Sequence, residues 1–177
     1  MSGNFIEFDD LSNAIDNLAM ALHFLKLDNP EQRWKWTIIA IHQALYGFAI
    51  LVIRGTNPHP LTEDNRNKLI SIGEALKRAK DDGFLTWSNS VSLKTTTDQD
   101  WAINKLTQEF RNSFEHFKPG VWAIEISGMP QIITHVMDVI CFLAFDSHSV
   151  MYQSLEQKTQ TKELFDAIFE RLDELRT

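Results

Sequence analysis

The segment from Trp34 to Ile53 is apolar on nearly every side of a helix, and this feature limits the folds open to the chain. A helix without a polar face must be covered on all sides by other elements. Asn29-Pro30 before the segment and Gly55 after it are typical helix start and stop signals. The segment therefore predicts the buried central helix of a bundle. Its apolar positions include Trp34, Ile38, Ile41, Leu45, Phe48 and Val52.

Apolar residues at three- and four-residue steps predict further helices on both sides of the central one. The residues expected to start or cap these helices are Asp9 or Asp10, Asn29, Thr62 or Glu63, Asp98 and Met129. A last amphipathic helix is expected over 158–177. The segment 84–97 has no helical period and is expected to be an irregular loop, either functional and mobile or an ordinary connector. The predicted fold is an all-α bundle of five or six helices, forming one domain over 1–177.

Composition and charge narrow the class of protein further. The 177 residues are 44% hydrophobic, and seven glycines and five prolines are few for an all-β chain of this length. The formal net charge of −7 does not attract nucleic acid or an anionic membrane, so any polyanion site must be local. The acidic N-terminus does not resemble a secretory signal, and 37–53 is slightly short for a bilayer span. We expect a cytoplasmic protein without a membrane partner.

Metal and cofactor motifs give no match in the sequence. Of the six histidines, none has a glutamate three residues before it, and no two stand four residues apart on a helix. His23, His42 and His135 are scattered singly and are interpreted as core or surface histidines. The single cysteine rules out an intrachain disulfide, and no glycine-rich phosphate loop is present. We therefore expect neither a bound metal nor a cofactor.

The candidate site lies at the end of the predicted fourth helix, in Arg111-Asn112-Ser113-Phe114-Glu115-His116. On a helix Asn112 and His116 share a face and Arg111 flanks them. Arginine offers a forked donor that suits phosphate oxygens, and histidine can exchange a proton near neutral pH. These groups suit phosphodiester cleavage without a metal. Such cleavage needs two imidazoles, and a two-fold dimer would supply the second.

This pattern resembles the Arg-polar-x-x-x-His signature of the HEPN superfamily of helical bundles. The resemblance matches Arg111 and His116 to the catalytic pair and Asn112 to the polar residue after the arginine. It implies a homodimeric, metal-independent endoribonuclease that cleaves RNA, of toxin or antiviral type, with a nucleotidyltransferase-type antitoxin as a possible partner. The alternative is a non-catalytic HEPN-like bundle that binds a nucleotide or a protein partner.

Three competing interpretations remain open from the sequence. Arg54 and His59 have the same spacing as the candidate pair, but Gly55 and Pro58 intervene, so this second pair is treated as a coincidence. Arg111 and Glu115 are also four residues apart and could form a simple solvated ion pair. Additional phosphate contacts are conceivable at several basic residues, although a solvated helix face is the simpler explanation. These residues are Lys77, Arg78, Lys80, Lys94 and Lys105.

Overall fold

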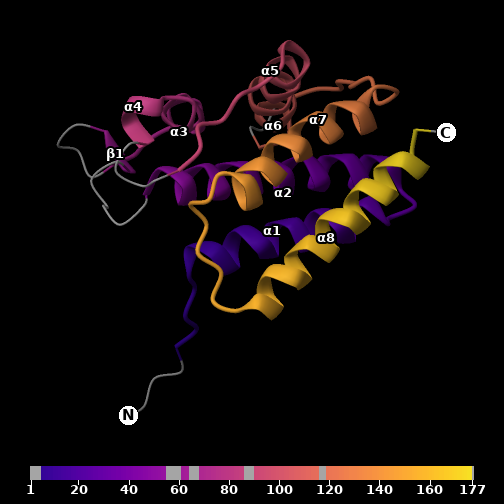
Figure 1. Ribbon diagram of the computed structural model, residues 1–177. Coiled ribbons are helices and arrows are strands. Elements are labelled where there is room, and N and C mark those ends of the chain that lie inside the picture. The colour runs from indigo at the N-terminus through magenta and orange to yellow at the C-terminus, as the bar shows by residue number, and fades with distance from the viewer. Residues whose placement is uncertain (1–4, 55–60, 64–67, 86–89, 116–118, 177) are drawn as a thin grey trace.

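Helix α2, Pro30–Arg54, forms the centre of the computed structural model, as its apolar sequence predicts. In Figure 1, α1 and α8 lie on one side of α2, and α7 with α5 and α6 lies on the other. Most of the α2 side chains between Trp34 and Ile53 are buried, including Ile38, Leu45 and Phe48 at 0% exposure. The structure describes residues 5–54, 61–63, 68–85, 90–115 and 119–176.

Helix α1, Asp10–Leu25, packs along α2 at very close range. Its N-terminus is capped by Asp9, whose carboxylate accepts a hydrogen bond of 2.8 Å from the amide of Ser12. The close approach centres on Gly47 of α2, where a Cβ atom would lie 3.0 Å from the Cβ of Ala14. A small residue on each helix is therefore what allows the two backbones to approach.

The chain between α2 and the third helix differs from the prediction of a helix that starts at Thr62 or Glu63. Residues Thr62–Glu63 (β1) and Lys68–Leu69 (β2) instead form a short antiparallel pair. Helix α3, Ile72–Ala79, begins only after Ser71, whose hydroxyl accepts a hydrogen bond from the amide of Glu74. The helix start is set by this cap, because a side chain that satisfies a free amide fixes where the helix begins.

The expected loop 84–97 contains helical residues at both ends. Helix α4 covers Asp82–Leu85, and α5 begins at Thr97. Between them, the described residues 90–96 are irregular but are packed in place. Leu93 is 2% exposed and its amide donates to the carbonyl of Ala79 at 2.8 Å, while the amide of Val91 donates to Ser147. This part of the segment is a fixed connector.

The second half of the chain forms three long helical segments. The first runs through α5 (Thr97–Asn104), a π-helical turn η2 (Lys105–Phe110) and α6 (Arg111–Glu115). The second joins α7 (Met129–Cys141) to another π-helical turn, η3 (Phe142–Asp146). The third is α8, Leu155–Glu174, which begins before the predicted residue 158 because Ser154 caps it. Asp98 is not the cap of α5, because Thr96 and Gln99 form a capping box there.

The prediction of an all-α fold is confirmed. If α5–η2–α6 and α7–η3 are each counted as one continuous segment, the described residues form seven helical segments, where five or six were predicted. Helix α8 packs on its own bundle through Phe165, Ile168 and Leu172, which are at most 1% exposed. Two helices, Pro30–Arg54 and Met129–Asp146, are long and apolar enough to cross a bilayer by length and composition. In the bundle 61% and 56% of their most apolar stretches are buried. Such helices are also typical of the core of a bundle.

The contact between α1 and α2 generates a stability prediction. Ala14→Leu places a larger side chain against Gly47 and is expected to lower the free energy of unfolding by about 1–3 kcal/mol, as overpacking of a core does. Ala19→Leu is the matched control, because Ala19 lies on the exposed face of the same helix. Urea unfolding followed by circular dichroism measures both variants. Equal stability of the two variants would contradict the assigned packing.

Candidate functional site

The helix that carries the candidate site changes its winding immediately before Arg111. The backbone amide of Arg111 donates to the carbonyl of Leu106, five residues earlier, at the end of the π-helical turn η2. Leu106 and Phe110 within this turn are buried against the core. A π-turn inserts an extra residue into a helix and is frequent at functional sites. It rotates the side chains of α6 relative to those of α5.

The guanidinium of Arg111 is held by two neighbours on the same helix. Its Nη1 donates to the side-chain oxygen of Asn112 at 3.1 Å, and its Nη2 forms an ion pair with Glu115. The amide nitrogen of Asn112 in turn donates to the carbonyl of Gln108 at 3.0 Å. The side chains of Arg111 and Glu115 are 29% and 25% exposed, so this ion pair is partly buried rather than fully solvated. Asn112 therefore orients the arginine.

His42 of α2 lies beside this pair, although it is 69 residues away from Arg111 in the sequence. The residue is 6% exposed. Burial is the main cause that lowers the pKa of this imidazole from 6.5 to about 4; the Arg111 cation acts in the same direction and the Glu115 carboxylate opposes both. His42 is consequently neutral at pH 7. A neutral imidazole has one nitrogen that donates and one that accepts a hydrogen bond.

His42, Arg111, Asn112 and Glu115 form a polar cluster between α2 and α6. Two buried nitrogens of this cluster, Nδ1 of His42 and Nε of Arg111, have no hydrogen-bond partner within the described part of the chain. Most buried polar groups in folded proteins are paired, and an unpaired one destabilises the fold. The cluster therefore holds unused hydrogen-bonding capacity on both the imidazole and the guanidinium.

In the structure Arg111 donates a hydrogen bond to Asn112, and His42, which sequence reasoning set aside as an isolated histidine, lies nearby. The one feature of the sequence that could have pointed to His42 is that a titratable side chain stands within the most apolar predicted helix. His116, the predicted acid and base, lies outside the described residues. In the coincidental pair, Arg54 forms an ion pair with Asp10 at the start of α1, and His59 also lies outside the described residues.

The additional basic residues suggested by the sequence all lie next to carboxylates. Lys77 and Arg78 pair with Glu74 at 3.9 Å and 2.8 Å. The other three pairs are Lys80–Asp100, Lys94–Asp82 and Lys105–Glu109, at 2.6 Å, 3.5 Å and 2.6 Å. Because these cations are neutralised locally, they do not form an open phosphate-binding patch. Among the described residues there is also no group of three histidine, cysteine or acidic side chains placed to hold a metal ion.

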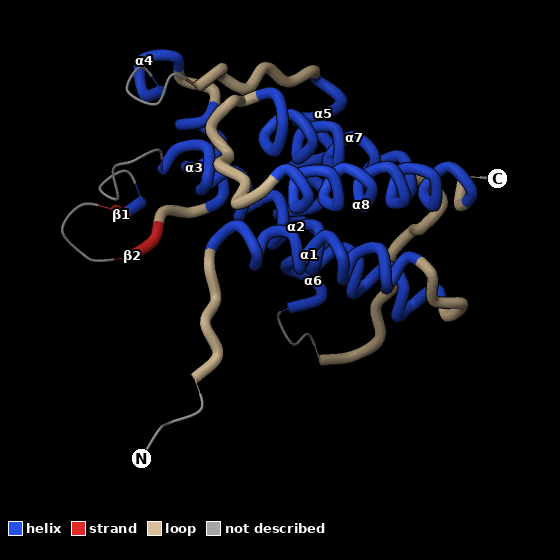
Figure 2. The backbone as a smooth tube through the Cα atoms, turned by 60° about the horizontal axis from the view of Figure 1, so that its bottom comes forward, coloured by secondary structure: helices blue, strands red, loops and turns tan. Residues whose placement is uncertain are grey.

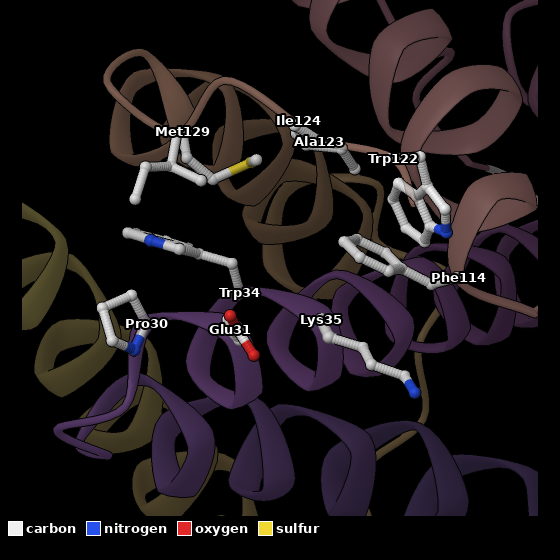
Figure 3. A pocket seen from close by; sticks show the side chains of 10 residues that line it. Pro30, Glu31, Trp34, Lys35, Phe114, Trp122, Ala123, Ile124 and Met129 are labelled. Carbon is white, nitrogen blue, oxygen red and sulfur yellow. The ribbon is translucent and has the colours of Figure 1, made fainter. Parts of the chain in front are cut away.

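Two cavities flank α6 and the extended segment 121–126. One, of about 500 Å³, lies between the start of α2, α6 and the start of α7 (Figure 3). The other, of about 490 Å³, lies between the α5–α6 segment and the start of α7. Both volumes are within the range of small-molecule sites, about 300–1,000 Å³. Searches of family models, curated proteins and solved structures gave no match to this chain.

The lowered pKa of His42 generates a prediction for stability against pH. Between pH 6.5 and about 4 the unfolded chain protonates this imidazole while the folded protein does not. Stability is therefore highest above pH 6.5 and falls as the pH decreases, by about 3 kcal/mol in total for this group. Urea unfolding at several pH values measures the slope. His42→Phe should flatten it over this range.

His23→Gln is the control for this measurement, because His23 lies on the exposed face of α1. This variant should keep the wild-type dependence on pH. An unchanged slope in His42→Phe would show that His42 titrates normally in the folded protein.

Proposed function

We propose that this protein is a metal-independent endoribonuclease of the HEPN type, with a composite site built from Arg111, Asn112 and His116 of two copies. The observation that carries the proposal is the state of Arg111. Asn112 and Glu115 hold its guanidinium in one orientation, and the Arg111 side chain is 29% exposed. A forked guanidinium in a fixed orientation suits the oxygens of a phosphodiester. The resemblance of the surrounding motif to the HEPN signature supports the same chemistry.

The position of α6 is compatible with a site shared between two subunits. None of the residues of α6 is fully buried, and the helix lies at the periphery of the bundle (Figure 2). A two-fold axis near α6 would bring the same helix of each subunit together. Each Arg111 would then face the Arg111 of the other copy across one phosphodiester.

In the proposed reaction His116 of one subunit withdraws the proton of a ribose 2′-hydroxyl. The resulting oxygen attacks the adjacent phosphorus, and the bond to the 5′-oxygen breaks. His116 of the other subunit protonates that leaving oxygen. Arg111 stabilises the negative charge that develops on the phosphoryl oxygens. The products are a 2′,3′-cyclic phosphate and a free 5′-hydroxyl.

The proposed setting is a cytoplasmic homodimer that acts as a toxin or antiviral effector. Its partners would be RNA and, in a two-gene system, a nucleotidyltransferase-type antitoxin. The net charge of −7 and the local neutralisation of the lysines argue for recognition at the site itself. We expect no membrane partner.

A second candidate function is a non-catalytic bundle that binds a nucleotide or a protein partner. The ion pair between Arg111 and Glu115 favours it, because a carboxylate beside the guanidinium competes with a phosphate. The cavity lined by Phe114 on the same helix favours it as well. The two functions differ in whether bound RNA is cut.

Because the proposed reaction uses no metal ion, it leads to a prediction about RNA cleavage. Cleavage of a short RNA should persist in EDTA and leave a 2′,3′-cyclic phosphate, because the nucleophile is the 2′-hydroxyl. Mass spectrometry of the fragments identifies this end. A substrate with a deoxyribose at the cleaved position should resist cleavage. Strict dependence on Mg²⁺ or Mn²⁺ would overturn the mechanism.

Substitutions at the motif separate the enzyme from the binding bundle. His116→Ala should reduce the cleavage rate at least about 100-fold, since general acid–base catalysis contributes about 10²–10⁴-fold. Arg111→Ala should cause a similar loss and also weaken RNA binding. Cleavage assays and binding titrations, with thermal unfolding as a check of the fold, measure these effects.

The matched controls are Arg54→Ala and His59→Ala, which have the same spacing in the sequence and should cleave RNA normally. Equal losses at both pairs would identify the motif as structural. Wild-type protein that binds RNA without cutting it would favour the second function.

A further inference from the structure

The cavity of about 500 Å³ beside the candidate site has walls formed by aromatic side chains from three different elements. Trp34 of α2 lies on one side, and Phe114 of α6 with Trp122 of the extended segment lies on the other (Figure 3). The rings of Phe114 and Trp122 contact each other at a centroid distance of 5.6 Å. Met129, at the start of α7, covers the cavity from above in this view. Such walls suit a flat aromatic ligand.

Two oppositely charged side chains line the same cavity on α2. Glu31 and Lys35 are four residues apart, so they lie on one face of the helix. Within the described residues, the carboxylate of Glu31 takes part in no ion pair or hydrogen bond, whereas the ammonium of Lys35 lies 4.8 Å from the ring centroid of Trp36. The ammonium of Lys35 points away from the cavity in Figure 3, so a ligand that presents two adjacent donors would complement the carboxylate of Glu31. A purely aliphatic chain would not use this carboxylate.

The cavity is within reach of the candidate phosphate site. Phe114 follows Arg111 by three residues, so the two side chains leave α6 about one turn apart. On α2, Lys35 precedes His42 by seven residues, which is about 10.5 Å along the helix. A nucleotide could therefore place its base in the cavity and its phosphate towards Arg111.

We propose that this cavity binds a guanine base of the RNA substrate. The proposal deepens the proposed function and rests on it for the identity of the polymer. Guanine has two adjacent donors, the N1–H and the 2-amino group, which match the two oxygens of one carboxylate such as Glu31. Uracil has a single donor between two acceptors and fits this carboxylate less well.

Calorimetric titration of the wild-type protein with guanosine 5′-monophosphate, uridine 5′-monophosphate and ribose 5-phosphate tests the site without any cleavage. The guanine nucleotide should bind at least about tenfold more tightly than ribose 5-phosphate, since base stacking on an aromatic side chain gives about this factor. It should also bind more tightly than the uridine nucleotide. Equal binding of all three probes, or no binding of the guanine nucleotide, would overturn the proposal.

Three variants test the assigned contacts. Trp122→Ala should weaken binding of the guanine nucleotide about tenfold by removing part of the aromatic wall. Glu31→Gln should bring the affinities for the guanine and uridine nucleotides close together, because the charged acceptor is lost. Trp101→Ala is the matched control: Trp101 is 50% exposed and lines the second cavity, so its loss should leave binding unchanged. A loss as large in Trp101→Ala as in Trp122→Ala would contradict the assignment.

The outcome for the base site can be separated from the outcome for the nuclease. RNA cleavage by a protein that does not bind the guanine nucleotide would overturn the base site alone. Selective binding of the guanine nucleotide by a protein that never cleaves RNA would overturn the nuclease and retain the base site.

Discussion

The need to bury α2 on every side determines the arrangement of the other helices. Its sequence leaves no polar face for solvent between Trp34 and Ile53, so α1 and α8 cover one side and the α5–α6 and α7–η3 segments cover the other. Burial of this apolar surface stabilises the fold, as burial of apolar surface does generally. Helix α6 packs against α2 as part of this second side. The position of Arg111 is thus a consequence of core formation.

Two polar side chains of α2 are buried within this core. Thr37 is fully buried with an unpaired hydroxyl, and His42 is buried with an unpaired Nδ1, as far as the structure describes the chain. Each such group costs about 1–3 kcal/mol relative to a paired one. Apolar residues at both positions would avoid this loss of folding free energy. Local departures of this kind from a stable core are typical of functional sites.

The long helices could be predicted because their apolar residues repeat with the period of a helix over many turns. The start of α3 could not, because Thr62, Glu63 and Ser71 are all plausible start signals and only Ser71 acts as the cap. The π-helical turn before Arg111 has no sequence signature. Local spacing placed Arg111 and Asn112 on one stretch of helix, whereas the position of His42 beside them depends on how α2 and α6, which are far apart in the sequence, pack together. The sequence therefore could not indicate that His42 lies near the candidate residues.

The ion pair with Glu115 sets the balance of charge at the proposed phosphate site. In the protein alone, Glu115 neutralises part of the Arg111 cation, and Asn112 occupies a further guanidinium nitrogen. A phosphate that approaches must share the guanidinium with Glu115 or displace it, and a nearby carboxylate repels it. Binding of the base at a separate cavity would contribute free energy that offsets this repulsion without any additional cation. Specificity for RNA in an acidic protein can therefore arise from two modest contacts acting on one nucleotide, rather than from a basic surface.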